Sequence, residues 1–192
     1  MAQRAEKRMS VEEFLAWQLG QEKLYELVDG QPYLPLKSIA GATHNHDTVV
    51  VNALTSLREQ LRGKPCRPKS QAIGVKIPRG NVRRLDVLID CGKGAPSDTI
   101  ATEPRVVVEV LSPSTMNFDR VTKLPEYMTV PSIVSILLVD TERPRVTVYR
   151  RRGAEWESDT IEGLDGIIDR LGMEVALPLA MLYEDVEFEP QA

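Results

Sequence analysis

The sequence has little of what marks secreted or membrane-spanning proteins. It contains only two cysteines, Cys66 and Cys91, without the Cys-x-x-Cys spacing of a zinc ribbon or the density of a disulfide framework. No apolar run approaches the roughly 18 residues that a membrane helix needs, and residues 1–10 lack the apolar stretch of a signal peptide. We therefore expect a soluble cytoplasmic protein in which both cysteines are reduced.

An excess of positive charge is also missing. The 24 Lys and Arg residues are outnumbered by 28 Asp and Glu residues, which leaves a net charge of −4 at pH 7. Proteins that coat nucleic acid through their net field usually carry a strong positive excess, so this class is disfavoured, whereas a local basic cleft is not. Basic residues do gather at three places, namely 83–84, Lys64 with Arg67 and Lys69, and 150–152.

What the chain does contain is typical of one globular domain. Its 192 residues are 42% hydrophobic and 27% charged. A chain of this size buries on the order of 70% of its unfolded surface, so a sizeable core is available. The sequence shows no internal repeat, low-complexity tract or linker. We expect a single α/β (α+β) domain over residues 10–186, with short tails at 1–9 and 187–192.

Local patterns predict the elements of this domain. Ser10 and Glu13 form a capping box before a helix over 10–19, and the Asp29-Gly30 pair between two extended runs predicts a hairpin. Apolar residues at three- and four-residue steps predict a helix over 46–62. The further expected elements are strands over 71–77, 84–90 and 105–111, a turn at 112–115, a helix near 119–128, strands over 136–140 and 145–150, and a helix beginning at Pro178.

Two acidic residues interrupt apolar segments that are predicted to be strands. Asp86 lies among Leu-Asp-Val-Leu-Ile, and Glu109 follows three valines. A buried carboxylate is costly unless it is paired or binds a cation, so two of them on adjacent strands point to one divalent ion. The alternative is that each faces solvent, or pairs with Arg83, Arg84 or Arg105, and strand alternation makes inward and outward positions equally frequent.

Lys123 is a third candidate, because a helix after the Glu109 strand can bring its ammonium to the same place. A lone helical lysine is usually solvated, so this residue carries little information by itself. Pro125 follows two residues later, where a proline inside a helix costs about 3 kcal/mol. We expect the helix to kink or restart at this point.

The order of Asp86, Glu109 and Lys123 resembles the PD-(D/E)XK superfamily of restriction-endonuclease-like nucleases. The resemblance is closer to the Uma-two family of restriction endonucleases, and it spans about residues 10–184. The segments that carry it are 25–30 (Tyr-Glu-Leu-Val-Asp-Gly), 85–87 (Leu-Asp-Val), 108–115 (Val-Glu-Val-Leu-Ser-Pro-Ser-Thr), Asp119-Arg120 with Lys123 and Tyr127, and 138–140 (Leu-Val-Asp). The Glu-Val-Leu-Ser-Pro-Ser-Thr run is the most specific of them.

The resemblance implies a restriction-endonuclease-like mixed sheet flanked by helices, and a metal-dependent endonuclease that hydrolyses phosphodiester bonds of DNA. Asp86 and Glu109 would bind Mg²⁺ or Mn²⁺, which prefer carboxylate oxygens. Lys123 would be the catalytic base or a charge stabiliser, with Glu26 as a supporting acid.

Further expectations concern substrate contacts and assembly. His46 and Asn52 match a His and an Asn of the family's long helix, and we expect His46 and Arg84 to contact substrate. A homodimer is expected, because enzymes that cut both DNA strands often present two sites related by a two-fold axis.

Two departures from the superfamily pattern keep other hypotheses open. Leu85 stands where the superfamily has a proline, and Leu111 stands where it has its lysine. Pro125 and the acidic charge balance favour, as the alternative function, a catalytically inactive nucleic-acid-binding or interaction module of the same fold. A metal hydrolase that acts on smaller phosphoesters is a third hypothesis.

Overall fold

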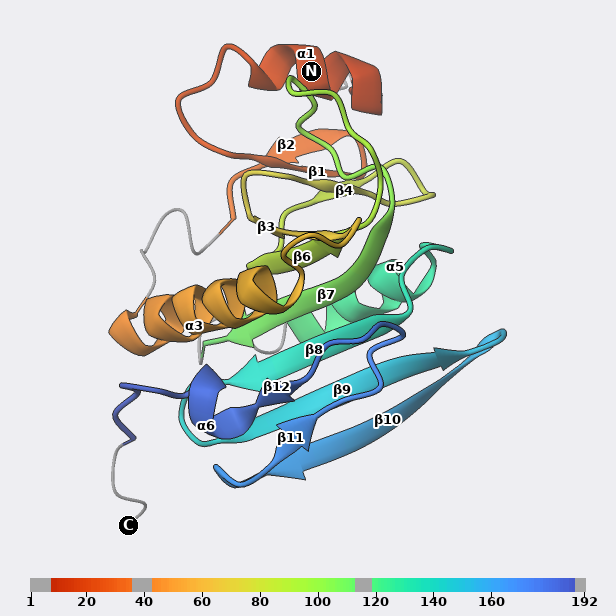
Figure 1. The fold of residues 1–192 in the computed structure, drawn as a ribbon. Helices are drawn as coiled ribbons and strands as arrows, with labels where there is room; N and C mark the ends of the chain where they lie inside the picture. Colours follow the sequence, from red (N-terminus) through yellow and green to blue (C-terminus); the bar gives the residue numbers. More distant parts are fainter. Residues whose placement is uncertain (1–7, 36–42, 113–118, 189–192) are drawn as a thin grey trace.

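A six-stranded mixed sheet lies at the centre of the computed structural model, which describes residues 8–35, 43–112 and 119–188 (Figure 1). Its strand order is β10-β9-β8-β7-β6-β3, and β7 and β8 are its parallel pair. The strands are β3 (Arg67–Ser70), β6 (Val87–Asp90), β7 (Pro104–Leu111), β8 (Ser135–Asp140), β9 (Arg145–Arg152) and β10 (Glu155–Glu162).

A smaller sheet, ordered β2-β1-β5-β4, carries the N-terminal helix. Its strands are β1 (Glu26–Val28), β2 (Gln31–Tyr33), β4 (Val75–Lys76) and β5 (Val82–Arg83), and α1 (Val11–Gln18) packs on it through the buried Phe14. Asp29 and Gly30 both have positive φ, as the tight β1–β2 turn requires. A third pair, β11 (Ile167–Ile168) and β12 (Leu177–Pro178), leads into α6 (Leu179–Leu182).

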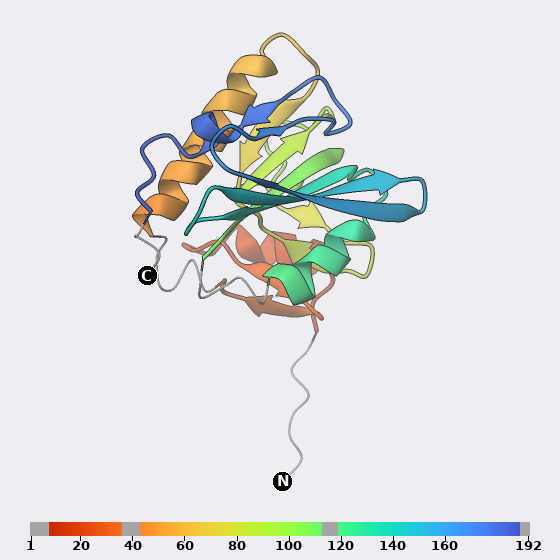
Figure 2. The same ribbon diagram turned by 90° about the horizontal axis from the view of Figure 1, so that it is seen from below.

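Helices cover both faces of the central sheet. The long helix α3 (His44–Gln60) packs on one face, and the short helix α5 (Leu124–Met128) lies on the other (Figure 2). Side chains of β7 alternate between them: Val106, Val108 and Val110 belong to the α3 side, and Val107 and Leu111 belong to the α5 side. A strand covered on both faces is apolar at consecutive positions, which is why β7 contains few polar residues.

Most of the expected elements are present. The helices over 10–19 and 46–62, the Asp29-Gly30 hairpin and the strands over 105–111, 136–140 and 145–150 are confirmed within a few residues. The segment after residue 118 forms one turn of π-helix, η1 (Asp119–Lys123), and then α5, so the expected break at Pro125 takes the form of a restart. Most of the expected turn at 112–115 lies outside the described residues.

Two predictions about strands were wrong, and strand β10 was not predicted. The strand expected over 84–90 begins only at Val87, so Asp86 precedes β6 instead of interrupting it. The strand expected over 71–77 is reduced to β4, and β3 lies before it. Strand β10 was missed because six of its eight residues are exposed and polar; its hairpin with β9 forms around Gly153, whose φ is +64°.

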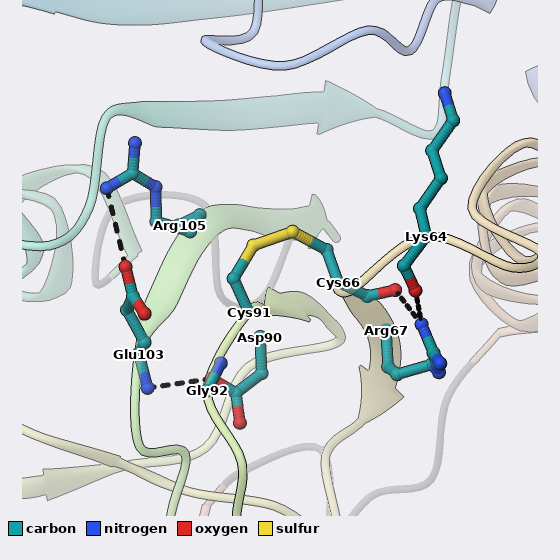
Figure 3. The surroundings of a disulfide bond; sticks show 8 residues. All are labelled: Lys64, Cys66, Arg67, Asp90, Cys91, Gly92, Glu103 and Arg105. Atoms are coloured by element: carbon teal, nitrogen blue, oxygen red, sulfur yellow. Dashed lines mark hydrogen bonds and ion pairs between the residues drawn. A yellow bond between two sulfur atoms is a disulfide. The ribbon is translucent and has the colours of Figure 1, made fainter.

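The expectation that both cysteines are reduced is contradicted, since Cys66 and Cys91 form a disulfide (Figure 3). The β3–β6 ladder explains why they meet. Arg67 pairs with Asp90 at the end of this ladder, so the cysteines stand directly opposite one another one position further on. In the described part of the chain, no helix has the length and apolar character needed to cross a membrane.

The disulfide closes a loop of 25 residues. By loop-closure entropy it should stabilise the fold by about 3 kcal/mol. We expect the double variant Cys66→Ser, Cys91→Ser to lose about this much unfolding free energy in urea without reductant. Dithiothreitol should destabilise the wild type to the same extent and leave the variant unchanged. Two titratable thiols in wild-type protein unfolded without reductant would contradict this prediction.

Candidate active site

The antiparallel β6–β7 ladder brings Asp86 and Glu109 together. Val87 pairs with Val108, so continuing the register by one residue places Asp86 beside Glu109. Here the backbone N–H of Val110 donates to Asp86 Oδ2 at 2.8 Å. Only 6% of Asp86 and 1% of Glu109 is exposed. These acidic residues therefore do not face solvent, although alternation alone allowed it.

Lys123, at the end of η1, brings its ammonium to the same place. Its Nζ lies 3.2 Å from Glu109 Oε1, 3.4 Å from Glu26 Oε1 and 3.4 Å from Asp119 Oδ1. The π-helical turn η1 ends at Lys123, and Pro125 lies in the first turn of α5, the part of a helix that tolerates proline best. Pro125 is thus compatible with an inward-pointing Lys123.

The surroundings of Lys123 keep it charged. Burial lowers the pKa of its ammonium, but the carboxylates of Glu109, Glu26, Asp119 and Asp86 outweigh burial and raise the pKa above its usual value. Four carboxylates thus act on one ammonium, and Lys123 remains a cation throughout the physiological range.

Tyr127 binds the same carboxylate oxygen of Glu109 as Lys123 does. Its hydroxyl donates to Glu109 Oε1 at 2.6 Å, so this oxygen contacts both Tyr127 and Lys123. Burial, together with the negative charges of Glu109 and Glu26, raises the pKa of Tyr127 well above its usual value. Tyr127 therefore stays protonated and acts as a hydrogen-bond donor.

Glu26 links this centre to the smaller sheet. Its Oε2 accepts from Arg83 Nη1 at 2.9 Å, and its Oε1 accepts from the backbone N–H of Arg84 at 3.0 Å and lies beside Lys123. Arg83 is fully buried and also donates to both carboxylate oxygens of Glu126. Both oxygens of Glu26 are therefore engaged by protein groups.

His46 and Arg84 occupy different kinds of position. His46 lies in the first turn of α3, and its Nε2 is 3.3 Å from Asp86 Oδ1. The guanidinium of Arg84 is buried and donates to the backbone carbonyls of Tyr25, Gln71 and Ala72. His46 therefore belongs to the centre, whereas Arg84 ties three backbone segments together beside it.

Asn52, the other matched residue of the long helix, lies away from the carboxylates. Its side-chain amide donates to the carbonyls of Leu182 and Glu184 and fastens the C-terminal segment to α3.

Comparison with known proteins identifies the family. A family model described as "Putative restriction endonuclease", Uma2, matches residues 11–181. The chain belongs to the Uma2 family. It is 31% identical over 146 residues to an uncharacterized protein of Synechocystis sp., a match covering 75% of each chain.

A solved structure has the same fold. It is described as a putative nuclease belonging to DUF820 from Anabaena variabilis, and it is 16% identical to this chain. The similarity covers 91% of this chain and 97% of that one, with a TM-score of 0.68. The restriction-endonuclease-like fold expected from the Uma2 motifs is thereby confirmed.

The chemistry of the Uma2 centre fits a magnesium or manganese ion. Among the residues that the structure describes, no three His, Cys, Asp or Glu side chains are arranged to hold an ion together. Mg²⁺ does not need three, because it keeps several waters and binds one or two protein carboxylates with substrate phosphate oxygens. Asp86 and Glu109 supply two such carboxylates within a centre where acidic groups outnumber the ammonium.

Sequence reasoning had not assigned a role to Asp119, Tyr127, Arg83 or Glu126 in this Uma2 centre. Asp119 lies four residues before Lys123, a spacing that signals a helical ion pair, and Tyr127 continues the same face. Arg83 was considered only as a partner for Asp86 or Glu109, and the structure pairs it with Glu26 and Glu126. No local signal identifies Glu126 as its partner.

Removing one member of a fully buried ion pair leaves its partner uncompensated. We expect Glu26→Gln to lower the unfolding free energy by about 3 kcal/mol, because Arg83 and Lys123 both lose a charged neighbour. Glu12→Gln is the control, since it breaks an exposed pair with Lys76 and should change stability little. Urea denaturation of both variants measures this, and equal stabilities would contradict the prediction.

Proposed function

We propose that the protein is a metal-dependent DNA endonuclease that hydrolyses phosphodiester bonds with Mg²⁺ or Mn²⁺. The observation that carries the proposal is the position of the Lys123 ammonium, 3.2 Å from Glu109 and within the electrostatic reach of Asp86. These three residues come from three separate segments. A lysine with no role in the centre would not need a buried ammonium in contact with Glu109 and close enough to Asp86 for their charges to interact.

In this proposal Asp86 and Glu109 hold the metal ion. When bound, the ion polarises the phosphate and lowers the pKa of a water. The backbone N–H of Val110 orients the Asp86 carboxylate, and Tyr127 orients Glu109 through their common hydrogen bond. Lys123 bears a fixed positive charge, which favours stabilisation of the negative transition state over the role of general base.

Glu26 has a supporting role in this scheme. Its carboxylate lies between the buried cations Arg83 and Lys123 and positions the lysine. Contacts with Arg83, with the backbone of Arg84 and with Lys123 hold this carboxylate in place, which fits a positioning role.

Plasmid cleavage tests the proposed activity. Wild-type protein should nick or linearise supercoiled plasmid with Mg²⁺ or Mn²⁺ and not with EDTA. Asp86→Asn, Glu109→Gln and Lys123→Met should each lower the rate by about a hundredfold or more, the typical cost of losing one preorganised charged group. Glu157→Gln on β10 is the control. The Glu157 carboxylate pairs with Arg152 of β9, at the sheet edge remote from Asp86, so this substitution should not affect the rate.

A folded wild type that leaves plasmid intact with both metals would contradict generic nuclease activity. That result would favour the inactive nucleic-acid-binding or interaction module. Cleavage that survives the Asp86 and Glu109 substitutions would place the catalytic centre elsewhere in the chain.

Metal binding can be measured apart from catalysis. A ligand that binds only the folded state at a hundred times its Kd stabilises the protein by about 2.7 kcal/mol. We expect Mn²⁺ to raise the melting temperature of the wild type and to leave that of the Asp86→Asn, Glu109→Gln double variant unchanged. The same increase in both proteins would show that these carboxylates do not bind the ion.

A further inference from the structure

A cavity of about 420 Å³ lies at the β3 edge of the central sheet, at the opposite end of β6 from Asp86. Its walls come from β3, from the end of β6 and from the loop that follows β6. Three basic residues line it, Arg67 and Lys69 on β3 and Lys93 in the loop. We call this site the β3-edge cavity; the proposed active site does not use it.

These three cations differ from most others on the surface. Within residues 8–35, 43–112 and 119–188, many exposed basic side chains lie beside a carboxylate, as in Lys64 with Glu174 and Arg152 with Glu157. No ion pair between described residues involves Arg67, Lys69 or Lys93. Lys23, Arg58, Arg62 and Arg79 also lack an ion pair with described residues, so what distinguishes the three cations is that they line one cavity.

The two acidic residues in the lining are engaged by backbone groups. Asp90 Oδ1 accepts from the backbone N–H groups of Gly92 and Glu103, which Figure 3 shows beside Asp90. Its Oδ2 accepts from the backbone N–H of Thr102. Asp98 Oδ2 accepts from the N–H of Ala95 at 2.7 Å. These carboxylates shape the loop and form no ion pair with the three cations, so the charges of the lining leave a positive excess of one.

The walls of the cavity are fixed in place. The disulfide joins Cys66, next to Arg67, to Cys91 in the lining (Figure 3). The guanidinium Nη1 of Arg67 donates to the carbonyls of Lys64 and Cys66, which holds the side chain against the start of β3. These contacts restrain Arg67 and the start of β3, so binding at that part of the cavity loses less conformational entropy.

The position of the cavity at the β3 edge of the sheet limits which kinds of molecule can bind there. An exposed edge strand can pair with another chain, but β3 is four residues long and contains Pro68 between Arg67 and Lys69. Proline and charged residues on an edge prevent strand addition. Arg67 and Lys69 are two residues apart, which spaces them by about 7 Å on one face, the axial rise of about two nucleotides.

We propose that the β3-edge cavity binds the phosphate backbone of DNA at a distance from the cleavage site. This inference rests on the proposed nuclease function. Asp86, just before β6, and Asp90, at its end, are four residues apart, about 13 Å along an extended chain, which corresponds to the axial rise of about four nucleotides. The cavity thus supplies a sequence-independent contact that positions a duplex relative to the carboxylates.

The test compares two double variants that change net charge equally. Lys69→Gln with Lys93→Gln removes cations of the cavity, whereas Lys23→Gln with Lys76→Gln removes two exposed lysines near α1 and β4. Binding of a fluorescein-labelled 20-base-pair duplex is followed by anisotropy in EDTA between 50 and 200 mM KCl. Each lost phosphate contact should reduce the slope of log K against log salt by about 0.9, so the cavity variant should lose about 1.8.

At 50 mM KCl the cavity variant should bind the duplex at least about tenfold more weakly than the wild type, and the control variant should not. Equal slopes and affinities in the two variants would overturn the proposal. So would a wild type that does not bind the duplex. A cavity variant that loses binding of ATP but keeps the affinity for duplex would assign the cavity to free nucleotides and also overturn it.

Hydrolysis of bis(p-nitrophenyl) phosphate with Mn²⁺ separates this proposal from the proposed nuclease function. This small phosphodiester cannot span the two sites, so the cavity variant should hydrolyse it at the wild-type rate. A wild type that binds duplex through Lys69 and Lys93 but cleaves neither substrate would support the cavity and contradict the nuclease.

Discussion

The ammonium of Lys123 is the charge on which the buried centre depends. Burying a charged group is costly unless opposite charges surround it, and here Glu26, Glu109 and Asp119 lie within 3.4 Å of it. Without this cation, carboxylates from β1, β7 and η1 would repel one another in a region of low dielectric. One lysine therefore allows three separate parts of the chain to place acidic residues together beside Asp86.

A second buried cation extends the same arrangement to the rest of the fold. Arg83 joins Glu26 on β1 to Glu126 on α5, so that the smaller sheet and the short helix share one guanidinium. Glu26 lies between Arg83 and Lys123. The smaller sheet is consequently part of the centre's support, because its displacement would separate Glu26 from both cations.

The two ends of β6 have different physical character. At its start, acidic residues surround Lys123 in the interior. At its end, Asp90 and the disulfide hold a loop that carries Lys93, beside the basic residues of β3. In the two proposals, an acidic protein combines an interior that binds a divalent cation with a surface that binds an anion. The net charge of the chain reveals neither the acidic interior nor the basic surface site, because each is a local feature.

Elements whose pattern is local follow from the amino-acid sequence alone. Capping at Ser10, the Asp29-Gly30 turn and the apolar periodicity of α3 and β7 need only near neighbours, and the structure contains all of them. The Uma2 motifs likewise lie in short segments, so the order of residues along the chain is enough to indicate the family and its fold.

Which residues meet, by contrast, depends on the tertiary structure. Asp86 and Glu109 are 23 positions apart in the chain, and their contact follows from ladder register. The Cys66–Cys91 bond follows from the register of another ladder, while the inward turn of Lys123 follows from a single π-helical turn before Pro125. The polar strand β10 forms because its backbone pairs with that of β9 along its whole length. Such contacts depend on register and packing between distant segments, which composition and local spacing do not specify.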